Sequence, residues 1–392
     1  MSFSIEDAAR EHPARIALVD ADRALSYLDL AAKVRAARSE LRPLVDPSRP
    51  LALRARPRLG TIFAVLALLE DRIPFVPIHP RLTEAEASVL VADANASRVI
   101  DDDVFAALEA AAPIADPLEK WPYPSDVLAT LFTSGTTGKA RGAVLPRASF
   151  AASAEASAAN LPWKDDDRWL LCMPLGHVGG LSIVTRTLAA RRTVVFQSRF
   201  DVDAVLGAIG TQKVTRISVV PTMLYDLLER DTENRLASLE TVLVGGAATS
   251  PSLLEECARR KVRALTTYGL TEACSQVATQ APRDPAYVLL GSGDALPGAT
   301  IEIARADGTL AAAGEIGSIS VRGPMLMRGY LGHAPLADGR FDTGDMGVLD
   351  ERGALHVVAR RTDLVVTGGE NVYPLEVEAA LAACTGVAGA VV

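Results

Sequence analysis

The stretch 61-TIFAVLALLEDRIPFVPI-78 decides the fold class of this chain, because a helical segment and a short strand follow each other within it. Residues 61–71 predict an apolar helix, and residues 73–78 predict a β-strand bounded by prolines. The flanking segments continue this alternation with capped helices and a strand end, at 26–44, 83–95 and 98–103. Alternating helices and short apolar strands are typical of an α/β fold with buried parallel strands.

The same rhythm continues through three β-branched runs, each ending in Gly, Pro or polar residues, at 192–197, 216–221 and 240–246. Ligands of open α/β sheets bind at the carboxyl ends of the strands, so we expect the site in the loops that follow these runs. The pattern changes after about residue 285. There, apolar and polar residues alternate between Gly/Asp turns, which favours an antiparallel sheet or small barrel, at 300–310, 316–323 and 353–360.

These patterns predict a large N-terminal domain, residues 1–361, of layered βαβ sheets with helices and an antiparallel β-barrel-like subdomain at about 285–361. Residues 374–386 predict a helix and residues 387–392 an apolar strand. Because so short a segment cannot bury its own core, we interpret residues 362–392 as a hinge and the truncated start of a small C-terminal α+β domain.

Composition and simple sequence features indicate which classes of protein and of partner to expect. The 392 residues predict more than one subdomain, and the formal net charge of −8 argues against nucleic acid, whose phosphates require a basic face. The N-terminus lacks the apolar core of a signal peptide, and the run at 61–69 is too short to span a bilayer. The cysteines lack metal-ligand spacing and predict reduced thiols, at Cys172, Cys257, Cys274 and Cys384. We therefore expect a cytoplasmic protein.

The glycine-rich segment 131-LFTSGTTGKARGAVL-145 has the composition of a phosphate-binding loop. Glycines let backbone N–H groups approach an anion, and hydroxyls and cations add donors and charge. The spacing fits neither the Walker loop nor the dinucleotide-binding pattern. A phosphate site and a mobile surface loop both stay open on this segment alone.

Two more segments carry polar groups next to glycines. In 268-YGLTEACSQ-276, Thr271 and Glu272 follow a strand-like run, and a single carboxylate with substrate phosphates suits Mg²⁺. Alone, this segment would predict a turn entering a helix. In 342-DTGDMGVLDERGAL-355, Asp345 lies in a Gly-flanked turn that would alone be a hairpin.

The order of the motifs is more specific than any one of them. TSGTTGKARG, VLVGGA, YGLTE, GEIGSISVRGPMLMRGY, FDTGD and ARRTDLVVTGGENVYPLEVE occur in the order of the adenylate-forming superfamily, which the chain resembles over essentially its whole length. That superfamily includes acyl- and aryl-CoA ligases, luciferases and peptide-synthetase adenylation domains. The resemblance implies that ATP, with Mg²⁺, activates a carboxylic acid as an acyl-adenylate. A thiol, usually coenzyme A, then displaces AMP.

The resemblance also implies residue roles. The glycine-rich loop would hold the β- and γ-phosphates of ATP with Thr133, Ser134, Gly135, Thr136, Thr137, Gly138 and Lys139. The remaining nucleotide contacts would come from Gly245, Gly246, Ala247, Tyr268, Gly269, Asp345 and Arg360. Among these, Tyr268 would stack on adenine, Asp345 would accept the ribose hydroxyls, and Arg360 would reach ribose and phosphate. Thr271 would contact the α-phosphate, and Glu272 would be the metal ligand.

Three positions depart from the family pattern: Arg141 replaces a lysine, Ala359 replaces a glycine, and Thr362 replaces the usual Asp or Lys of the hinge. No residue matches the lysine that the family carries in its C-terminal domain. We therefore expect this chain to bind ATP and acid but to adenylate poorly.

The acid is indicated by 173-MPLGHVGGLSIVTRTL-188 and the residues after YGLTE. These segments resemble o-succinylbenzoate–CoA ligases of menaquinone biosynthesis, which implies that His177 lies between the acid and the thiol tunnel and that Arg186 binds a second carboxylate. The remaining acid contacts would be Gly246, Leu270, Ser275 and Gln276. Several alternatives stay open: a ligase for benzoate, anthranilate or a similar aryl acid, a non-catalytic nucleotide-binding remnant, a carrier protein as thiol acceptor, and a structural role for His177. A homodimer is one expected state.

Overall fold

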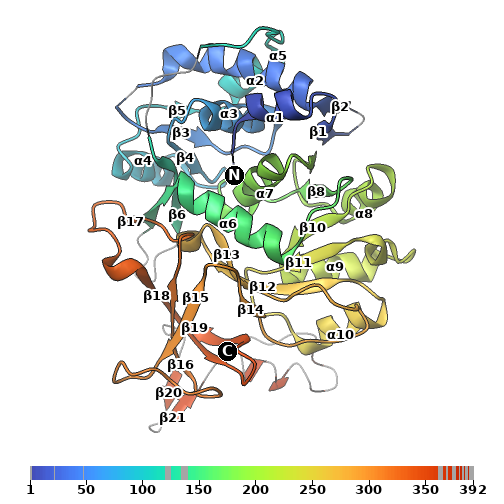
Figure 1. The fold of residues 1–392 in the computed structure, drawn as a ribbon, viewed down its shortest axis with the longest axis vertical. Helices are drawn as coiled ribbons and strands as arrows, with labels where there is room; N and C mark the ends of the chain where they lie inside the picture. The colour runs from blue at the N-terminus through green and yellow to red at the C-terminus, as the bar shows by residue number, and fades with distance from the viewer. Residues whose placement is uncertain are drawn as a thin grey trace.

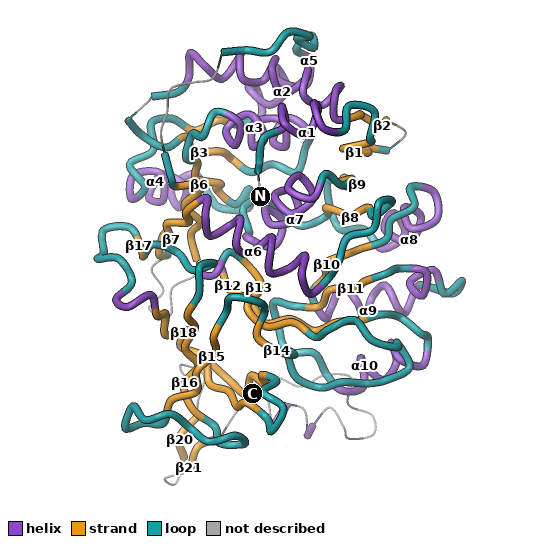
Figure 2. The backbone as a smooth tube through the Cα atoms, in the orientation of Figure 1, coloured by secondary structure: helices purple, strands orange, loops and turns teal. Residues whose placement is uncertain are grey.

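The computed structural model describes residues 2–21, 23–46, 48–119, 125–133 and 140–360, short pieces at 365–367, 370–372, 377–378 and 380–381, and residues 384 and 387. Figure 1 shows the N-terminal part at one end, two large sheets around helices α6 and α7 in the middle, and an antiparallel sheet at the other end. In Figure 2 most helices lie in the first two regions, whereas the last is formed mainly by strands and loops.

The first large sheet has six strands. Their order across the sheet is β17 (Gly329–Tyr330), β7 (Arg141–Pro146), β6 (Val127–Thr133), β4 (Phe75–Ile78), β3 (Leu51–Arg54) and β5 (Val99–Ile100). β5, β3, β4 and β6 run parallel to one another. β7 pairs antiparallel with β6 on one side and with β17 on the other. The helices of this region are α1 (Ile5–Glu11), α2 (Tyr27–Leu41), α3 (Leu59–Glu70), α4 (Glu84–Asp93) and α5 (Asp102–Ala110).

The second large sheet has nine strands. Their order is β14 (Asp294–Ala295), β13 (Ser275–Thr279), β12 (Ala264–Leu270), β11 (Thr241–Val244), β10 (Arg216–Val219), β8 (Arg168–Leu171), β9 (Thr193–Phe196), β1 (Ile16–Asp20) and β2 (Arg23–Ser26). Its central strands are parallel. The helices of this region are α6 (Arg147–Asn160), α7 (Val178–Ala190), α8 (Val202–Thr211), α9 (Pro221–Arg230) and α10 (Pro251–Arg259).

One apolar core joins the two large sheets. It contains Leu53 of the first sheet, Trp169 of the second, and Phe150 and Leu181 from α6 and α7. A separate cluster packs α8, α9 and α10 against the second sheet, through residues such as Leu227. Helices α6 and α7 are therefore positioned from both sheets at once.

The region after residue 295 is antiparallel, as predicted. Its four strands lie in the order β15 (Thr300–Ala304), β16 (Gly317–Arg322), β18 (Arg340–Leu349) and β19 (Leu355–Arg360). A two-stranded ribbon, β20 (Val365–Thr367) and β21 (Glu370–Val372), follows. The helix and strand predicted at 374–386 and 387–392 lie largely outside the described residues.

The predicted fold class is confirmed, and two local interpretations are wrong. The strand end predicted at 98–103 is present as β5, and Asp101, directly after it, caps the start of α5, a helix that was not predicted. YGLTE does not enter a helix; after the 3-10 turn η3 (Thr271–Ala273) the chain turns back as strand β13. The segment 342–355 belongs to the β18–β19 hairpin, as predicted, but Asp345 lies inside β18 rather than in the turn, beside a register shift near Gly344, whose φ is +79°.

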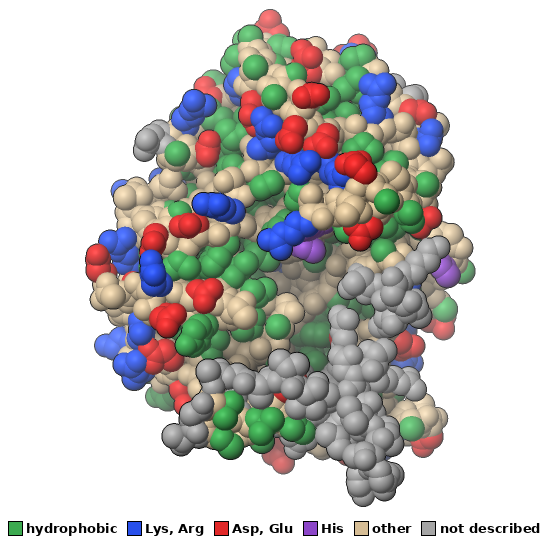
Figure 3. Space-filling model, turned by 180° about the vertical axis from the view of Figure 1, so that it is seen from behind, with side chains coloured by type: hydrophobic (Ala, Val, Ile, Leu, Met, Phe, Trp, Pro, Cys, Tyr) green, Lys and Arg blue, Asp and Glu red, His purple; other side chains and the backbone are tan. Residues whose placement is uncertain are grey.

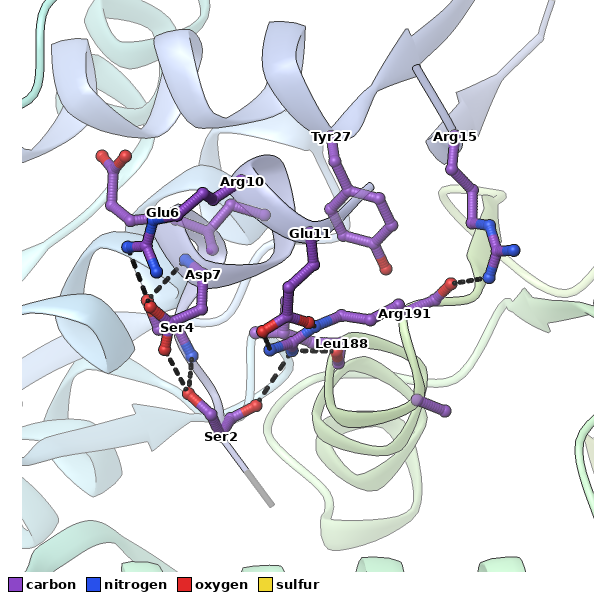
Figure 4. Close-up of polar contacts among 12 residues, drawn as sticks. Ser2, Ser4, Glu6, Asp7, Arg10, Glu11, Arg15, Tyr27, Leu188 and Arg191 are labelled. Carbon is purple, nitrogen blue, oxygen red and sulfur yellow. Dashed lines mark hydrogen bonds and ion pairs between the residues drawn. The ribbon is translucent and has the colours of Figure 1, made fainter. Parts of the chain in front are cut away.

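Polar contacts fix the end of helix α7 (Figure 4). Arg191 caps it in the left-handed conformation with φ of 57°. Its guanidinium donates to Glu11 Oε2 at 2.8 Å and to the carbonyls of Leu188 at 2.7 Å and Ser2 at 3.1 Å. Helix α7 is thus tied to the N-terminal segment and α1.

No helix in the described part of the chain is both long enough and apolar enough to cross a membrane. Among the cysteines, Cys172, Cys257 and Cys274 are buried free thiols, and Cys384 is an exposed one. This agrees with the predicted reduced thiols.

Candidate active site

The predicted nucleotide residues lie at the carboxyl ends of neighbouring strands. Gly245, Gly246 and Ala247 follow β11, and Tyr268 to Leu270 end β12, which is parallel to β11. Gly246 has φ of +82°, a conformation that favours glycine. A Cβ at Gly269 would lie 2.2 Å from the carbonyl oxygen of Ser275, so only glycine allows β13 to return this closely. The strand ends meet at the edge where α/β sheets bind ligands.

Tyr268 and Asp345, predicted to contact adenine and ribose, lie side by side. The Tyr268 hydroxyl donates to Asp345 Oδ2 at 2.6 Å. Burial and the Asp345 carboxylate raise the pKa of Tyr268, so the phenol stays protonated and keeps donating. The backbone of Arg360 in β19 pairs with that of Asp345, and its side chain lies outside the described residues.

Glu272 is held by a residue for which the sequence predicted no role. The Tyr330 hydroxyl, from β17, donates to Glu272 Oε1 at 2.5 Å. The Arg141 guanidinium lies over the Tyr330 ring, 4.2 Å from its centroid. Tyr330 was visible within the motif GEIGSISVRGPMLMRGY, but only the fold brings it to Glu272. Thr271 precedes Glu272 in η3 and is half-buried.

The glycine-rich loop is described at its two ends. Thr133 and Arg141 are paired at the loop end of the β6–β7 hairpin, where the Thr133 hydroxyl donates to the Arg141 carbonyl at 3.5 Å. The rest of the predicted phosphate contacts lie outside the described residues: Ser134, Gly135, Thr136, Thr137, Gly138 and Lys139.

Arg186 is buried in the middle of α7, with 3% of its surface exposed. Its Nη2 donates to Ser153 Oγ on α6 at a long 3.4 Å, and its Nε has no hydrogen-bond partner. Ser153 Oγ in turn donates to the Cys274 carbonyl at 2.9 Å. Burial lowers the pKa of Arg186 to about 10, so the side chain is still charged near neutral pH. Within the described residues it forms no ion pair.

Ser275 and Gln276, the predicted acid contacts on β13, lie near the same helices. Leu270 pairs with Ser275 and Gly269 with Gln276 across the β12–β13 hairpin. Gln276 is buried, and its Nε2 donates to Thr279 Oγ1 at 2.8 Å while its Oε1 has no partner. Contacts between α7 and β13 bring this strand next to the helix of Arg186.

His177 lies at the N-cap of α7 and is exposed. Its ring is 4.8 Å from that of His79, which follows β4 of the other large sheet. Partial desolvation by the surrounding protein lowers the pKa of each histidine, although His177 keeps contact with solvent. The Arg81 cation lowers both pKa values further, and His177 also lowers that of His79. The rings are therefore neutral near pH 7. His79 was not predicted, because its neighbour is close only in the fold.

Magnesium fits this arrangement through Glu272. No group of three or more His, Cys, Asp or Glu side chains in the described part of the chain could form a metal cage. Mg²⁺ commonly uses one or two carboxylates, water and substrate phosphates. Glu272 beside the root of the glycine-rich loop can supply such a carboxylate. Figure 3 shows from behind that the molecule is hollowed near its middle.

Comparisons with known proteins agree with these features. The chain matches the AMP-binding enzyme family over residues 5–331. A 2-succinylbenzoate–CoA ligase of Bacillus licheniformis is 34% identical, with 98% of this chain and 85% of the relative covered.

Two solved structures of the o-succinylbenzoate CoA synthetase of Bacillus subtilis are similar. The complex with the acyl-adenylate intermediate gives a TM-score of 0.90 at 32% identity, covering 100% of this chain and 84% of that chain. The complex with ATP and magnesium ion gives a TM-score of 0.88 at 33% identity, covering 98% of this chain and 85% of that chain. These relatives confirm the predicted fold and superfamily, and the chain therefore belongs to the family of AMP-binding enzymes.

Proposed function

We propose that this chain is an ATP-dependent, AMP-forming acid–CoA ligase whose acid is o-succinylbenzoate. The observation that carries the choice of acid is Arg186, a buried guanidinium without a counter-ion in the described residues. A second carboxylate on the substrate would pair with it. Benzoate or anthranilate would leave the buried charge unpaired, which is costly. The relatives named as 2-succinylbenzoate–CoA ligases support the same acid.

The reaction has two steps. An oxygen of the acid's reacting carboxylate forms a bond to the α-phosphorus of ATP, and the bond to the bridging oxygen breaks, releasing pyrophosphate. The thiol sulfur of coenzyme A then bonds to the acyl carbon, AMP leaves, and the thiol proton passes to solvent. A carboxylate is already ionised near pH 7, so the first step needs positioning and charge neutralisation more than a general base.

The chain's residues have separate tasks in this scheme. Tyr268 and Asp345 would orient the adenosine, and Arg186 and Gln276 would orient the acid. His177, beside His79, would separate the acid from the thiol. Bound Mg²⁺, on Glu272, would neutralise phosphate charge.

The test is calorimetry with non-hydrolysable o-succinylbenzoyl-adenylate and benzoyl-adenylate analogues. We expect the native chain to prefer the o-succinylbenzoyl analogue by about 100-fold, and Arg186→Met to abolish most of that preference while AMP binds as before. Arg230→Met, on an exposed arginine of α9, is the matched control. Arg186→Met removes an unpaired buried charge, so it should not lower the melting temperature.

Equal affinity of the native chain for the two analogues would contradict o-succinylbenzoate and favour a simpler aryl acid. Equal losses of AMP and acyl-adenylate binding in Arg186→Met would make Arg186 a structural residue. The cytoplasmic location, the homodimer and the domain division at residues 361 and 362 stay predictions. Analytical ultracentrifugation would test the homodimer.

A further inference from the structure

A continuous line of three side chains runs from the root of the glycine-rich loop to Glu272. Arg141 is the first residue of β7, directly after the loop. Its guanidinium lies 4.2 Å from the centroid of the Tyr330 ring, and the Tyr330 hydroxyl donates to Glu272 Oε1 at 2.5 Å. The line therefore connects β7, β17 and η3, which are separated along the chain.

Backbone pairing fixes the geometry of this line. β17 is added to the edge of β7, with Tyr330 opposite Ala143 and Gly329 opposite Val144. The backbone N–H of Met327, just before β17, donates to the Glu272 carbonyl at 2.6 Å. The strand that carries Tyr330 is thus bonded both to the loop's own hairpin and to the turn that carries Glu272.

The hydroxyl of Tyr330 has a defined role in this geometry. A phenol is protonated near pH 7, so the Tyr330 hydroxyl is the donor in its hydrogen bond with the Glu272 carboxylate. One carboxylate oxygen of Glu272 accepts this bond. No hydrogen bond to the other oxygen, Oε2, is present within the described part of the chain.

We propose that Tyr330 is a positioning residue that orients the Glu272 carboxylate toward Mg²⁺ and, through Arg141, links it to the phosphate-binding loop. The inference rests on the proposed function, which makes Glu272 the metal ligand. It also accounts for arginine at position 141, because a planar guanidinium stacks on an aromatic face in a way that an ammonium does not.

A purely structural role for Tyr330 has a different signature. Its ring packs edge-on against Phe341 and His333, with centroid distances of 6.3 and 6.5 Å. Tyr330→Phe preserves this packing and the stacking of Arg141, and it removes only the hydroxyl. The variant therefore separates orientation of Glu272 from packing.

The experiment measures binding of α,β-methylene-ATP to the full chain as Mg²⁺ is titrated, beside binding of AMP. In Tyr330→Phe we expect the Mg²⁺ concentration for half-maximal binding to rise about tenfold, since a hydrogen bond to a charged group is lost. Arg141→Lys should raise it about two- to fivefold. AMP, which lacks the β- and γ-phosphates, should bind both variants as it binds the native chain.

Tyr225→Phe is the matched control, because Tyr225 on α9 is 59% exposed. An unchanged Mg²⁺ midpoint in Tyr330→Phe overturns the inference. Parallel losses of AMP and nucleotide-analogue binding with a lower melting temperature also overturn it, since they show a packing role. If the native chain's own binding of the analogue does not depend on Mg²⁺, the failure lies in the proposed function of Glu272.

Discussion

At the scale of single residues, two carboxylates of the site are each oriented by a tyrosine hydroxyl. Tyr268 donates to Asp345 at 2.6 Å, and Tyr330 donates to Glu272 at 2.5 Å. Both tyrosines have a raised pKa because of burial and the neighbouring carboxylate, so both remain donors at neutral pH. A neutral donor leaves the carboxylate its full charge for a ligand. The two pairs divide the site into a ribose side and a phosphate side.

We predict that Tyr268→Phe weakens AMP binding about tenfold, because Asp345 loses the donor that orients it toward the ribose hydroxyls. The phenyl ring is kept, so stacking on adenine is preserved. The measurement is calorimetry with AMP and with 2′,3′-dideoxy-AMP. The dideoxy nucleotide should bind the variant and the native chain equally. Equal weakening for both nucleotides would place the effect of Tyr268 on the base rather than on the ribose.

At the scale of elements, helix α7 carries two candidate site residues and one residue that anchors it to the N-terminal segment. His177 caps its start, Arg186 lies in its interior, and Arg191 caps its end. The end is held by the contacts of Arg191 with Glu11, Ser2 and Leu188, and the Tyr27 hydroxyl donates to the carbonyl of the next residue, Arg192, at 2.8 Å. The position of a buried arginine on α7 thus depends on the N-terminal segment of the chain.

We predict that Arg191→Ala lowers the free energy of unfolding by about 2 kcal/mol, because several hydrogen bonds of a buried guanidinium are lost. Arg191→Gly should cost about 1 kcal/mol less than Arg191→Ala, since glycine tolerates the left-handed cap at φ of 57°. Melting temperatures should therefore fall in the order native, Arg191→Gly, Arg191→Ala. Glu11→Gln is the control. The Glu11 carboxylate, the partner of Arg191, is half exposed, so we expect this substitution to lower the free energy of unfolding by less than about 1 kcal/mol.

The elements that the sequence predicts best are those with local signals. Ser26 and Asp29 form a capping box at the start of α2, and Thr83 and Glu86 form another at α4. Both boxes involve residues three apart, so they can be recognised without the fold. The start of α5 was missed because Asp101 follows a strand of only two residues, and an acidic run is typical of strand ends as well as of helix caps.

The sequence predicted the site residues that lie within recognisable motifs, but not the residues that contact them. The positions of Tyr268, Glu272 and Asp345 follow from a resemblance over short segments, but their partners do not. Tyr330 is 58 residues from Glu272 in the chain, and their hydrogen bond depends on the pairing of β17 with β7. Likewise, no described side chain is a counter-ion for Arg186, and this depends on which side chains surround α7, which no sequence pattern gives.

At the scale of the whole molecule, the two large sheets meet through the segments that follow β4 and β8. His79 follows β4 of the six-stranded sheet, and His177 follows β8 of the nine-stranded sheet, at the start of α7. A Cβ at Gly176 would lie 3.1 Å from the His79 Cα, so the backbones of the two edges are in close contact. The paired rings lie 4.8 Å apart across this junction, near the cation of Arg81. Protonation of either ring would put cations together where the sheets meet.

We predict that acid weakens the junction between the sheets. The pKa of each histidine is lowered in the folded state from its ordinary value of about 6.5, so below that pH the unfolded chain binds protons that the folded chain does not. The free energy of unfolding should therefore fall as pH drops through 6.5 toward the lowered folded values. In urea unfolding at pH 7.5 and 5.5, His79→Gln should lose less stability on acidification than the native chain. An equal loss in the native and His79→Gln chains would show that the rings do not govern the junction, because a neutral glutamine leaves nothing at position 79 to protonate.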